Sequence, residues 1–152
     1  MDRILVVCLG NICRSPLAEA ILRKRAQELG LPLYVDSAGT GGWHSGDPPD
    51  PRAIVAARVH GLDIEEQRAR KLRREDFTKF DRILVMDEQN LVDVIARRPT
   101  DVQTPVNLIT DYRKQPGPRD IPDPYYSSKF EPVIAMLEDC VEGLLDQRIA
   151  AQ

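Results

Sequence analysis

Two side chains suited to phosphate chemistry, a thiol and a guanidinium, lie close together near the start of the sequence. Five residues separate Cys8 from Arg14, which is enough for the chain between them to curl and bring both groups to one point. An arginine can hold two phosphate oxygens through parallel hydrogen bonds, which a lysine cannot do. The pair therefore predicts a loop that holds a tetrahedral oxyanion above a sulfur nucleophile.

The other residues of this segment have the types that an anion-binding loop needs. Gly10 and Asn11 accept the left-handed backbone of a tight turn, and the Ser15 hydroxyl can donate to the sulfur and ease its departure. Inward amides, a helix dipole and the arginine all favour the thiolate. A lone cysteine at the end of a strand is more often an inert buried thiol. The complete set, between a strand and a helix, instead favours Cys8 as a nucleophile.

The elements on either side of the loop are those that such a site requires. Arg3–Val7 is an apolar, β-branched run typical of a short buried strand. A helical period extends from Ser15 to about Leu29, with Pro16 in the first turn. The N-terminus of that helix would direct its free N–H groups and positive dipole at the anion.

Later segments alternate between strand and helix patterns. The further predicted strands are residues 33–35, 82–86 and 105–108, and the further predicted helices are residues 52–60, 88–98 and 130–149. Asp50 and Asp87 suit the N-caps of two of these helices. The basic run Arg68–Arg74 is typical of a solvated helix face. Four prolines predict that the stretch 110–124 is a rigid loop, neither helix nor central strand.

This alternation predicts right-handed βαβ units in a single domain that spans residues 1–152. We expect an α/β fold with an open four-stranded parallel sheet, helices on both faces and the phosphate loop after the first strand. Ligands of such sheets bind at the carboxyl ends of the strands, where Cys8 lies.

Composition and charge exclude other classes of protein. The chain is 42% hydrophobic and 30% charged, as in ordinary globular domains, and its net charge of −3 argues against a nucleic-acid partner. No apolar run reaches membrane-spanning length and no signal peptide is visible, so we expect a cytoplasmic protein without a membrane partner. The two histidines form no metal-ligand cluster, and we expect neither a metal nor a cofactor.

The loop closely resembles the signature of the low-molecular-weight protein tyrosine phosphatases, in the string Cys8-Leu9-Gly10-Asn11-Ile12-Cys13-Arg14-Ser15-Pro16. The resemblance continues in the family's order at residues 36–40, 50–53, 85–87 and 123–126. It implies that the protein hydrolyses phosphotyrosine and small aryl phosphates through a phosphocysteine on Cys8. It also implies phosphotyrosine-containing proteins as partners, and we expect a monomer or a weak dimer.

The resemblance also selects the proton donor. Asp120 and Asp123 both lie in the proline-rich stretch, and the residues alone do not decide between them. The match to the family at Asp-Pro-Tyr-Tyr favours Asp123, which would protonate the leaving phenolate and later activate water. Tyr125 and Tyr126 would form one aromatic wall of the pocket.

Two supporting residues are implied by the family as well. The pattern around Ser37 alone predicts a turn residue, whereas the resemblance implies a brace that binds the phosphate loop through Asn11. In relatives a histidine at the place of His60 joins this network, although a histidine in the last turn also suits a helix C-terminus.

Three residues near the loop keep open interpretations. Trp43, in the Gly/Pro-rich loop 41–49, either folds onto its local surface or forms an apolar wall opposite the tyrosines, as the family implies. We expect the neighbouring His44 to be exposed, with no catalytic role. Cys13 is either a small buried filler or a thiol that traps an oxidised Cys8 as a reversible disulfide.

Particular residues disfavour three competing activities. Thioredoxin-linked arsenate reductases, which the loop also resembles, need two further cysteines after the third strand, and residues 86–104 contain none. Protein-arginine phosphatases have a threonine where this chain has Ile12. A phosphate-binding module without turnover would need neither Cys8 nor Asp123.

Overall fold

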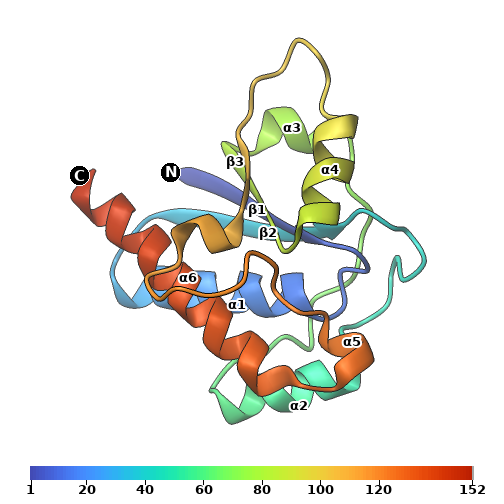
Figure 1. Cartoon of the computed structure of the whole chain (residues 1–152), viewed down its shortest axis with the longest axis vertical. Coiled ribbons are helices and arrows are strands. Elements are labelled where there is room, and N and C mark those ends of the chain that lie inside the picture. Colours follow the sequence, from blue (N-terminus) through green and yellow to red (C-terminus); the bar gives the residue numbers. More distant parts are fainter. Residues whose placement is uncertain (152) are drawn as a thin grey trace.

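A four-stranded parallel sheet forms the centre of the computed structural model, which describes residues 1–151 (Figure 1). The strands are β1 (Asp2–Cys8), β2 (Leu33–Gly39), β3 (Arg82–Val85) and β4 (Val106–Leu108), in the order β2-β1-β3-β4. The chain leaves β1 toward β2 and then crosses back to β3, so the direction of winding reverses beside β1. Ligands of open α/β sheets bind at such a switch point.

Helices cover both faces of the sheet, which confirms the predicted fold class. On one face α1 (Arg14–Glu28) packs against α6 (Phe130–Ala150), and the other face carries α3 (Asp76–Lys79) and α4 (Glu88–Arg97) (Figure 1). The remaining helical segments are α2 (Pro51–Val59), the 3-10 turn η1 (Ile109–Tyr112) and α5 (Pro124–Ser127). Among residues 1–151, no helix has both the length and the apolar composition needed to cross a membrane.

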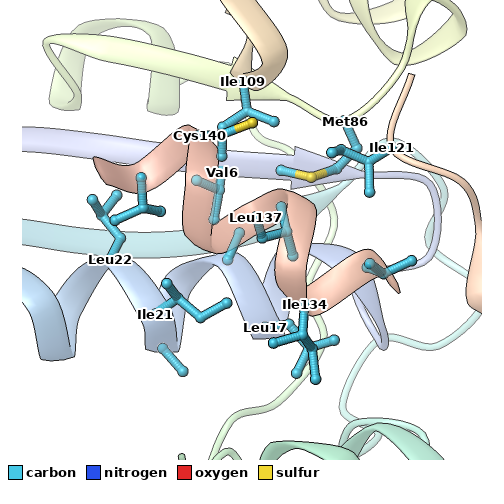
Figure 2. Packing of buried hydrophobic residues seen from close by; sticks show 14 of the residues in the cluster. Val6, Leu17, Ile21, Leu22, Met86, Ile109, Ile121, Ile134, Leu137 and Cys140 are labelled. Carbon is cyan, nitrogen blue, oxygen red and sulfur yellow. The ribbon is translucent and has the colours of Figure 1, made fainter. Parts of the chain in front are cut away.

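Alternate residues of the strands supply two separate apolar cores. Ile4 and Val6 of β1 belong to the core shared with α1 and α6, whereas Leu5 and Val7 belong to the core on the opposite face. Figure 2 shows the first core, in which Leu17 of α1 lies close to Ile134 of α6. Because both faces are covered, the strands consist of continuous apolar runs, as is usual in parallel sheets.

The four long helices lie within one residue of their predicted bounds at each end. Capping explains this agreement for two of them. Asp50 Oδ1 accepts a hydrogen bond from Arg52 N at 2.8 Å at the start of α2, and Asp87 Oδ1 accepts one from Asn90 N at 2.7 Å at the start of α4.

Three local predictions differ from the structure. β2 begins at the predicted residue but is longer than predicted, because residues 36–39 also pair with β1. The run Arg68–Arg74 forms no helix, because its backbone bonds to the end of β2: Gly39 N donates to Arg70 O, and Leu72 N donates to Gly39 O. The stretch 110–124 contains a helical turn, because η1 covers its first three residues, before the first proline at Pro116.

Gly143 lets α6 approach η1 closely. A Cβ at this position would lie 1.7 Å from the carbonyl oxygen of Tyr112. The absence of a side chain at Gly143 therefore sets the distance between α6 and η1, which lies between β4 and Asp123.

We expect Gly143→Ala to lower the free energy of unfolding by about 1–3 kcal/mol, the usual effect of overpacking a core. Helix propensity alone would favour alanine by about 1 kcal/mol, so the sign of the change tests the contact. Urea denaturation measures the difference, with Gln147→Ala at an exposed position of α6 as the control. A stabilised Gly143→Ala variant would contradict this packing.

Candidate functional site

A pocket opens at the carboxyl end of β1, at the switch point of the sheet. Its lining comes from the loop after β1 and from two distant segments: Cys8, Leu9, Gly10, Ile12, Cys13, Arg14, Trp43, His44, Asp123, Tyr125 and Tyr126. The structure therefore brings together the thiol, the guanidinium, the carboxyl group and the aromatic side chains that the sequence singled out.

The loop of residues 8–14 has its outer carbonyl oxygens bound by neighbouring segments. Three of them accept backbone hydrogen bonds at 2.9 Å: Cys8 O from Thr40, Leu9 O from Gly41 and Ile12 O from Asp50. Within residues 1–151 no acceptor engages the amides of Leu9, Gly10, Ile12, Cys13, Arg14 and Ser15. Because these three carbonyls point outward to their partners and the named amides have none, the loop offers donors to an anion.

The sulfur of Cys8 lies at the floor of the pocket. The residue is 3% exposed, Asn11 N donates to Sγ at 3.3 Å, and Ser15 Oγ lies 3.1 Å from Sγ. Asn11 has φ 59°, the left-handed conformation that the sequence predicted for it. Both partners lie beside the N-terminus of α1, so the sulfur is surrounded by polar groups of the loop and of the first helical turn.

Asn11 is held in place by three neighbouring segments. Its Nδ2 donates to Ser15 Oγ at 2.8 Å and to Ser37 Oγ at 3.0 Å, and its Oδ1 accepts from Arg70 N at 3.0 Å. Ser37 therefore lies in β2 and contacts the loop directly, so the alternative interpretation of Ser37 as a turn residue is wrong.

A buried carboxyl group lies behind Ser37. Glu19 of α1 is 5% exposed, forms an ion pair with Arg23 at 2.8 Å and is hydrogen-bonded by Ser37. Burial raises the pKa of Glu19 above its ordinary value, and the opposing effects of Ser37 and Arg23 do not cancel the shift. No local pattern predicts this burial, because residues 14–22 of α1 are buried on every side of the helix and a charged residue there interrupts no apolar stripe.

Arg70 is the supporting residue that the sequence most clearly failed to identify. Its guanidinium bridges Asp36 of β2 and Asp76 of α3, with N–O distances of 3.1 and 3.0 Å. This bridge holds the extended segment against Asn11, to which Arg70 donates its backbone N–H. Nothing in a run of basic residues distinguishes the one that turns inward.

Arg14 is buried and held by two acceptors. Its Nη1 donates to Asp87 Oδ2 at 2.7 Å and to Ile121 O at 2.9 Å, and its Nη2 lies 3.6 Å from Asp123 Oδ2. Burial alone would lower the pKa of Arg14, but the negative charge of Cys8 and the hydrogen bond to Asp87 outweigh it and raise the pKa above its ordinary value. The guanidinium therefore stays charged. Asp87, which the sequence predicted only as a helix cap, also orients it.

The structure separates the two candidate carboxyl groups of the proline-rich stretch. Asp123 lines the pocket, and its Oδ1 caps α5 by accepting from Tyr125 N at 3.1 Å. Asp120 is not part of the lining, and its Oδ1 accepts from Glu88 N at 3.0 Å at the start of α4. Only Asp123 is placed to reach a ligand in the pocket.

Aromatic side chains border the pocket from two segments. Trp43 is 72% exposed, and its ring lies over Gly41, where a Cβ would be 1.8 Å from Cζ3. Tyr125 and Tyr126 meet edge to face, with ring centroids 5.1 Å apart. Trp43 therefore both packs on its own loop and borders the pocket, so each of its two interpretations describes part of its position.

His44 is partly exposed, somewhat less than was expected of it. Its side chain is 34% exposed, lines the pocket and lies with Nδ1 3.3 Å from Asp47 Oδ2. Gly10 explains this position, because a Cβ there would lie 3.2 Å from His44 Cδ2. Gly10 does not adopt the left-handed conformation that was expected of it. The absence of a side chain at Gly10 instead leaves room for the ring of His44.

His60 does not join the network behind the loop, so this prediction is also wrong. Its Nε2 lies 2.6 Å from Glu131 Oε2 of α6. The cause is the direction of α2: its N-cap, Asp50, bonds to Ile12, and His60 is at the opposite end of the nine-residue helix. As for metals, the part of the chain that the structure describes contains no group of three His, Cys, Asp or Glu side chains that could hold one.

Cys13 lines the pocket as a neutral thiol. Burial raises the pKa of Cys13, and the negative charges of Asp50 and Cys8 add to the shift. Burial also raises the pKa of Cys140, in the first core, to about 11. Both thiols are therefore poorly suited to act as nucleophiles, because the thiolate is the reactive form. Both interpretations of Cys13 stay predictions.

Comparison with known proteins agrees with this geometry. The family model described as low molecular weight phosphotyrosine protein phosphatase matches residues 3–152. A putative low molecular weight protein-tyrosine-phosphatase of Synechocystis sp. is 43% identical over 148 residues, which cover 94% of each chain. The crystal structure of a protein tyrosine phosphatase from Entamoeba histolytica superposes with a TM-score of 0.94, at 34% identity and over 99% of each chain. That of a Drosophila arginine phosphatase superposes with a TM-score of 0.90, at 31% identity, over 97% of this chain and 98% of that one.

The buried Glu19 gives a test by pH. Because its pKa is raised on folding, the folded state binds the proton more tightly, and stability falls as the pH rises through the interval from the unfolded to the folded pKa. Glu19→Gln removes this loss. We expect the free energy of unfolding of Glu19→Gln, relative to the unsubstituted protein, to increase from acidic to neutral pH in urea titrations. The exposed Glu28→Gln on the same helix controls for the removal of one charge. A difference that shrinks toward neutral pH would contradict the burial effect.

Proposed function

The chain belongs to the low molecular weight phosphotyrosine protein phosphatase family, and from that premise we propose that it hydrolyses phosphotyrosine with Cys8 as nucleophile, Arg14 as phosphate ligand and Asp123 as proton donor. One observation carries this assignment of residues. Cys8 Sγ lies at the floor of a pocket, hydrogen-bonded to Asn11 N and Ser15 Oγ, beneath a loop with unpaired amides.

In the first step the Cys8 thiolate attacks phosphorus, the bond between phosphorus and the phenolic oxygen breaks, and a phosphocysteine forms. Charge spreads over the three non-bridging oxygens, where the loop amides and Arg14 stabilise it. The tyrosine phenol, with a pKa of about 10, needs a proton as it leaves. Asp123 donates that proton.

In the second step the Asp123 carboxylate takes a proton from water while the water oxygen bonds to phosphorus. The bond between phosphorus and sulfur breaks, Cys8 leaves as a thiolate, and orthophosphate is released. Ser15 Oγ, 3.1 Å from the sulfur, donates a hydrogen bond to it as it departs. Asn11 supports this role, because its Nδ2 donates to Ser15 Oγ and the hydroxyl hydrogen of Ser15 stays available for the sulfur.

The aromatic borders favour a tyrosine phosphate of a protein as the substrate. Trp43 on one segment and Tyr125 on the other can hold an aryl ring while its phosphate reaches the loop. The side chain of phosphoserine is shorter, and its phosphate would stop above Cys8. The three free thiols suit a reducing compartment, so we propose that the protein acts in the cytoplasm.

Phosphoarginine is the alternative substrate, because one structural relative is an arginine phosphatase. Ile12 lines the pocket and is 9% exposed. An apolar side chain at this place suits an aryl ring better than a polar guanidine group, which would lose hydrogen bonds to water there. This supports tyrosine over arginine.

We expect the purified protein to release phosphate from a phosphotyrosine peptide faster than from matched phosphoarginine and phosphoserine peptides. Cys8→Ser should abolish turnover while vanadate still binds in calorimetry, because the loop amides and Arg14 are retained. Cys140→Ala, which removes a buried thiol outside the pocket, is the control. Hydrolysis that survives in Cys8→Ser would exclude Cys8 as the nucleophile.

Asp123→Ala should lower kcat/KM for phenyl phosphate by roughly 10²–10⁴-fold, the usual contribution of a general acid. The loss should be smaller for p-nitrophenyl phosphate, whose phenolate leaves with less need for a proton. Asp120→Ala, which removes only the bond to Glu88, should show no such dependence on the leaving group. Equal losses on both substrates in Asp123→Ala would remove Asp123 as the acid.

A further inference from the structure

We propose that Arg52 is a positioning residue that aims Asp123 into the pocket, by joining the segment that carries Asp123 to the phosphate loop. The inference rests on the proposed function, because it concerns how the proton donor is held. Arg52 is not part of the pocket lining and lies on the first turn of α2, so it acts through the groups that it binds.

One side of Arg52 is fixed to the loop. Its Nε and Nη2 donate to the two carboxylate oxygens of Asp50 at 3.0 and 2.8 Å, a two-point contact that only an arginine makes. These hydrogen bonds lower the pKa of Asp50, which keeps the partner charged. Asp50 N donates in turn to Ile12 O at 2.9 Å. The ion pair is therefore attached directly to the phosphate loop.

The other side of Arg52 reaches both ends of α5. Its Nη1 donates to Ser128 Oγ at 2.7 Å, and its Nη2 donates to Tyr125 O at 3.1 Å. Its Cζ also lies 5.6 Å from the ring centroid of Tyr125 and 5.5 Å from that of Phe130. Guanidinium groups are attracted to aromatic faces at this range. One side chain thus connects α2, α5 and the start of α6.

α5 has few other contacts that could fix it. It is four residues long, and its two tyrosines, Tyr125 and Tyr126, are 44% and 77% exposed. Ser128, which ends it, has φ 62°, a conformation that a residue other than glycine adopts only when its surroundings hold it there. Because Asp123 caps α5 through Tyr125 N, the direction of its carboxyl group follows the position of this turn.

The experiment compares kcat/KM for phenyl and p-nitrophenyl phosphate in Arg52→Met and Arg52→Lys. We expect Arg52→Met to lower kcat/KM about tenfold more for phenyl phosphate than for p-nitrophenyl phosphate. This loss is part of the contribution that a general acid makes. Arg52→Lys should not restore it, because an ammonium group cannot make the two-point contact and the bridge together. Arg58→Met on the same helix, which removes only an exposed ion pair with Glu65, is the matched control.

The Asp123→Ala background separates this inference from the proposed function. There Arg52→Met should add no loss that depends on the leaving group, because the group that it positions is absent. If Asp123→Ala alone shows no leaving-group dependence, the proposed acid fails. Two other results would overturn the positioning role of Arg52 while Asp123→Ala shows the dependence. One is that Arg52→Met lowers kcat/KM equally for both substrates. The other is that Arg52→Met lowers kcat/KM for phenyl phosphate further in the Asp123→Ala background.

Discussion

The hydrogen bonds on the outer side of the phosphate loop are the constraint on which the site depends. Thr40, Gly41 and Asp50 each donate a backbone N–H to a loop carbonyl, and this fixes the orientation of the peptide planes. With these three carbonyls bound on the outer side, the loop keeps its amides for a ligand in a preorganised arrangement. The left-handed Asn11 completes the curve, and Ser37 and Arg70 hold Asn11.

The parallel sheet provides the framework for these contacts. Its switch point puts the end of β1 beside the ends of β2 and β3, so the loop is flanked by Thr40 on one side and by Asp87 on the other. Arg14 crosses this edge to Asp87, and Arg52 joins the loop to α5 through Asp50. Three arginines, counting Arg70, thus tie together segments that are far apart in the sequence. Each of them bridges acceptors from two elements, for which a planar group with several donors is suited.

The sequence was informative where a signal is local. The period of apolar residues predicted the strands and the long helices, and capping aspartates fixed the start of α2 and α4. The sequence was uninformative where a contact between distant segments decides the position of a side chain. The inward turn of Arg70, the second bond of Asp87 and the position of His44 against Gly10 depend on partners that no local pattern names. The prediction for His60 was wrong for the same reason, because the direction of α2 relative to the loop decides which groups His60, at the end of this helix, contacts.

Asp123 has two functions in the proposed cycle, and they are linked. Its carboxylate caps α5, and a carboxylate accepts a hydrogen bond from a helix N-terminus more strongly than a carboxylic acid does. The turn that bears Tyr125 is therefore held least firmly while Asp123 carries the proton that it will donate. It becomes firmer once that proton has passed to the leaving group. In the proposed cycle the entrance of the pocket is thus held least firmly when a substrate side chain enters, most firmly in the phosphocysteine intermediate, and less firmly again once Asp123 has taken a proton from water.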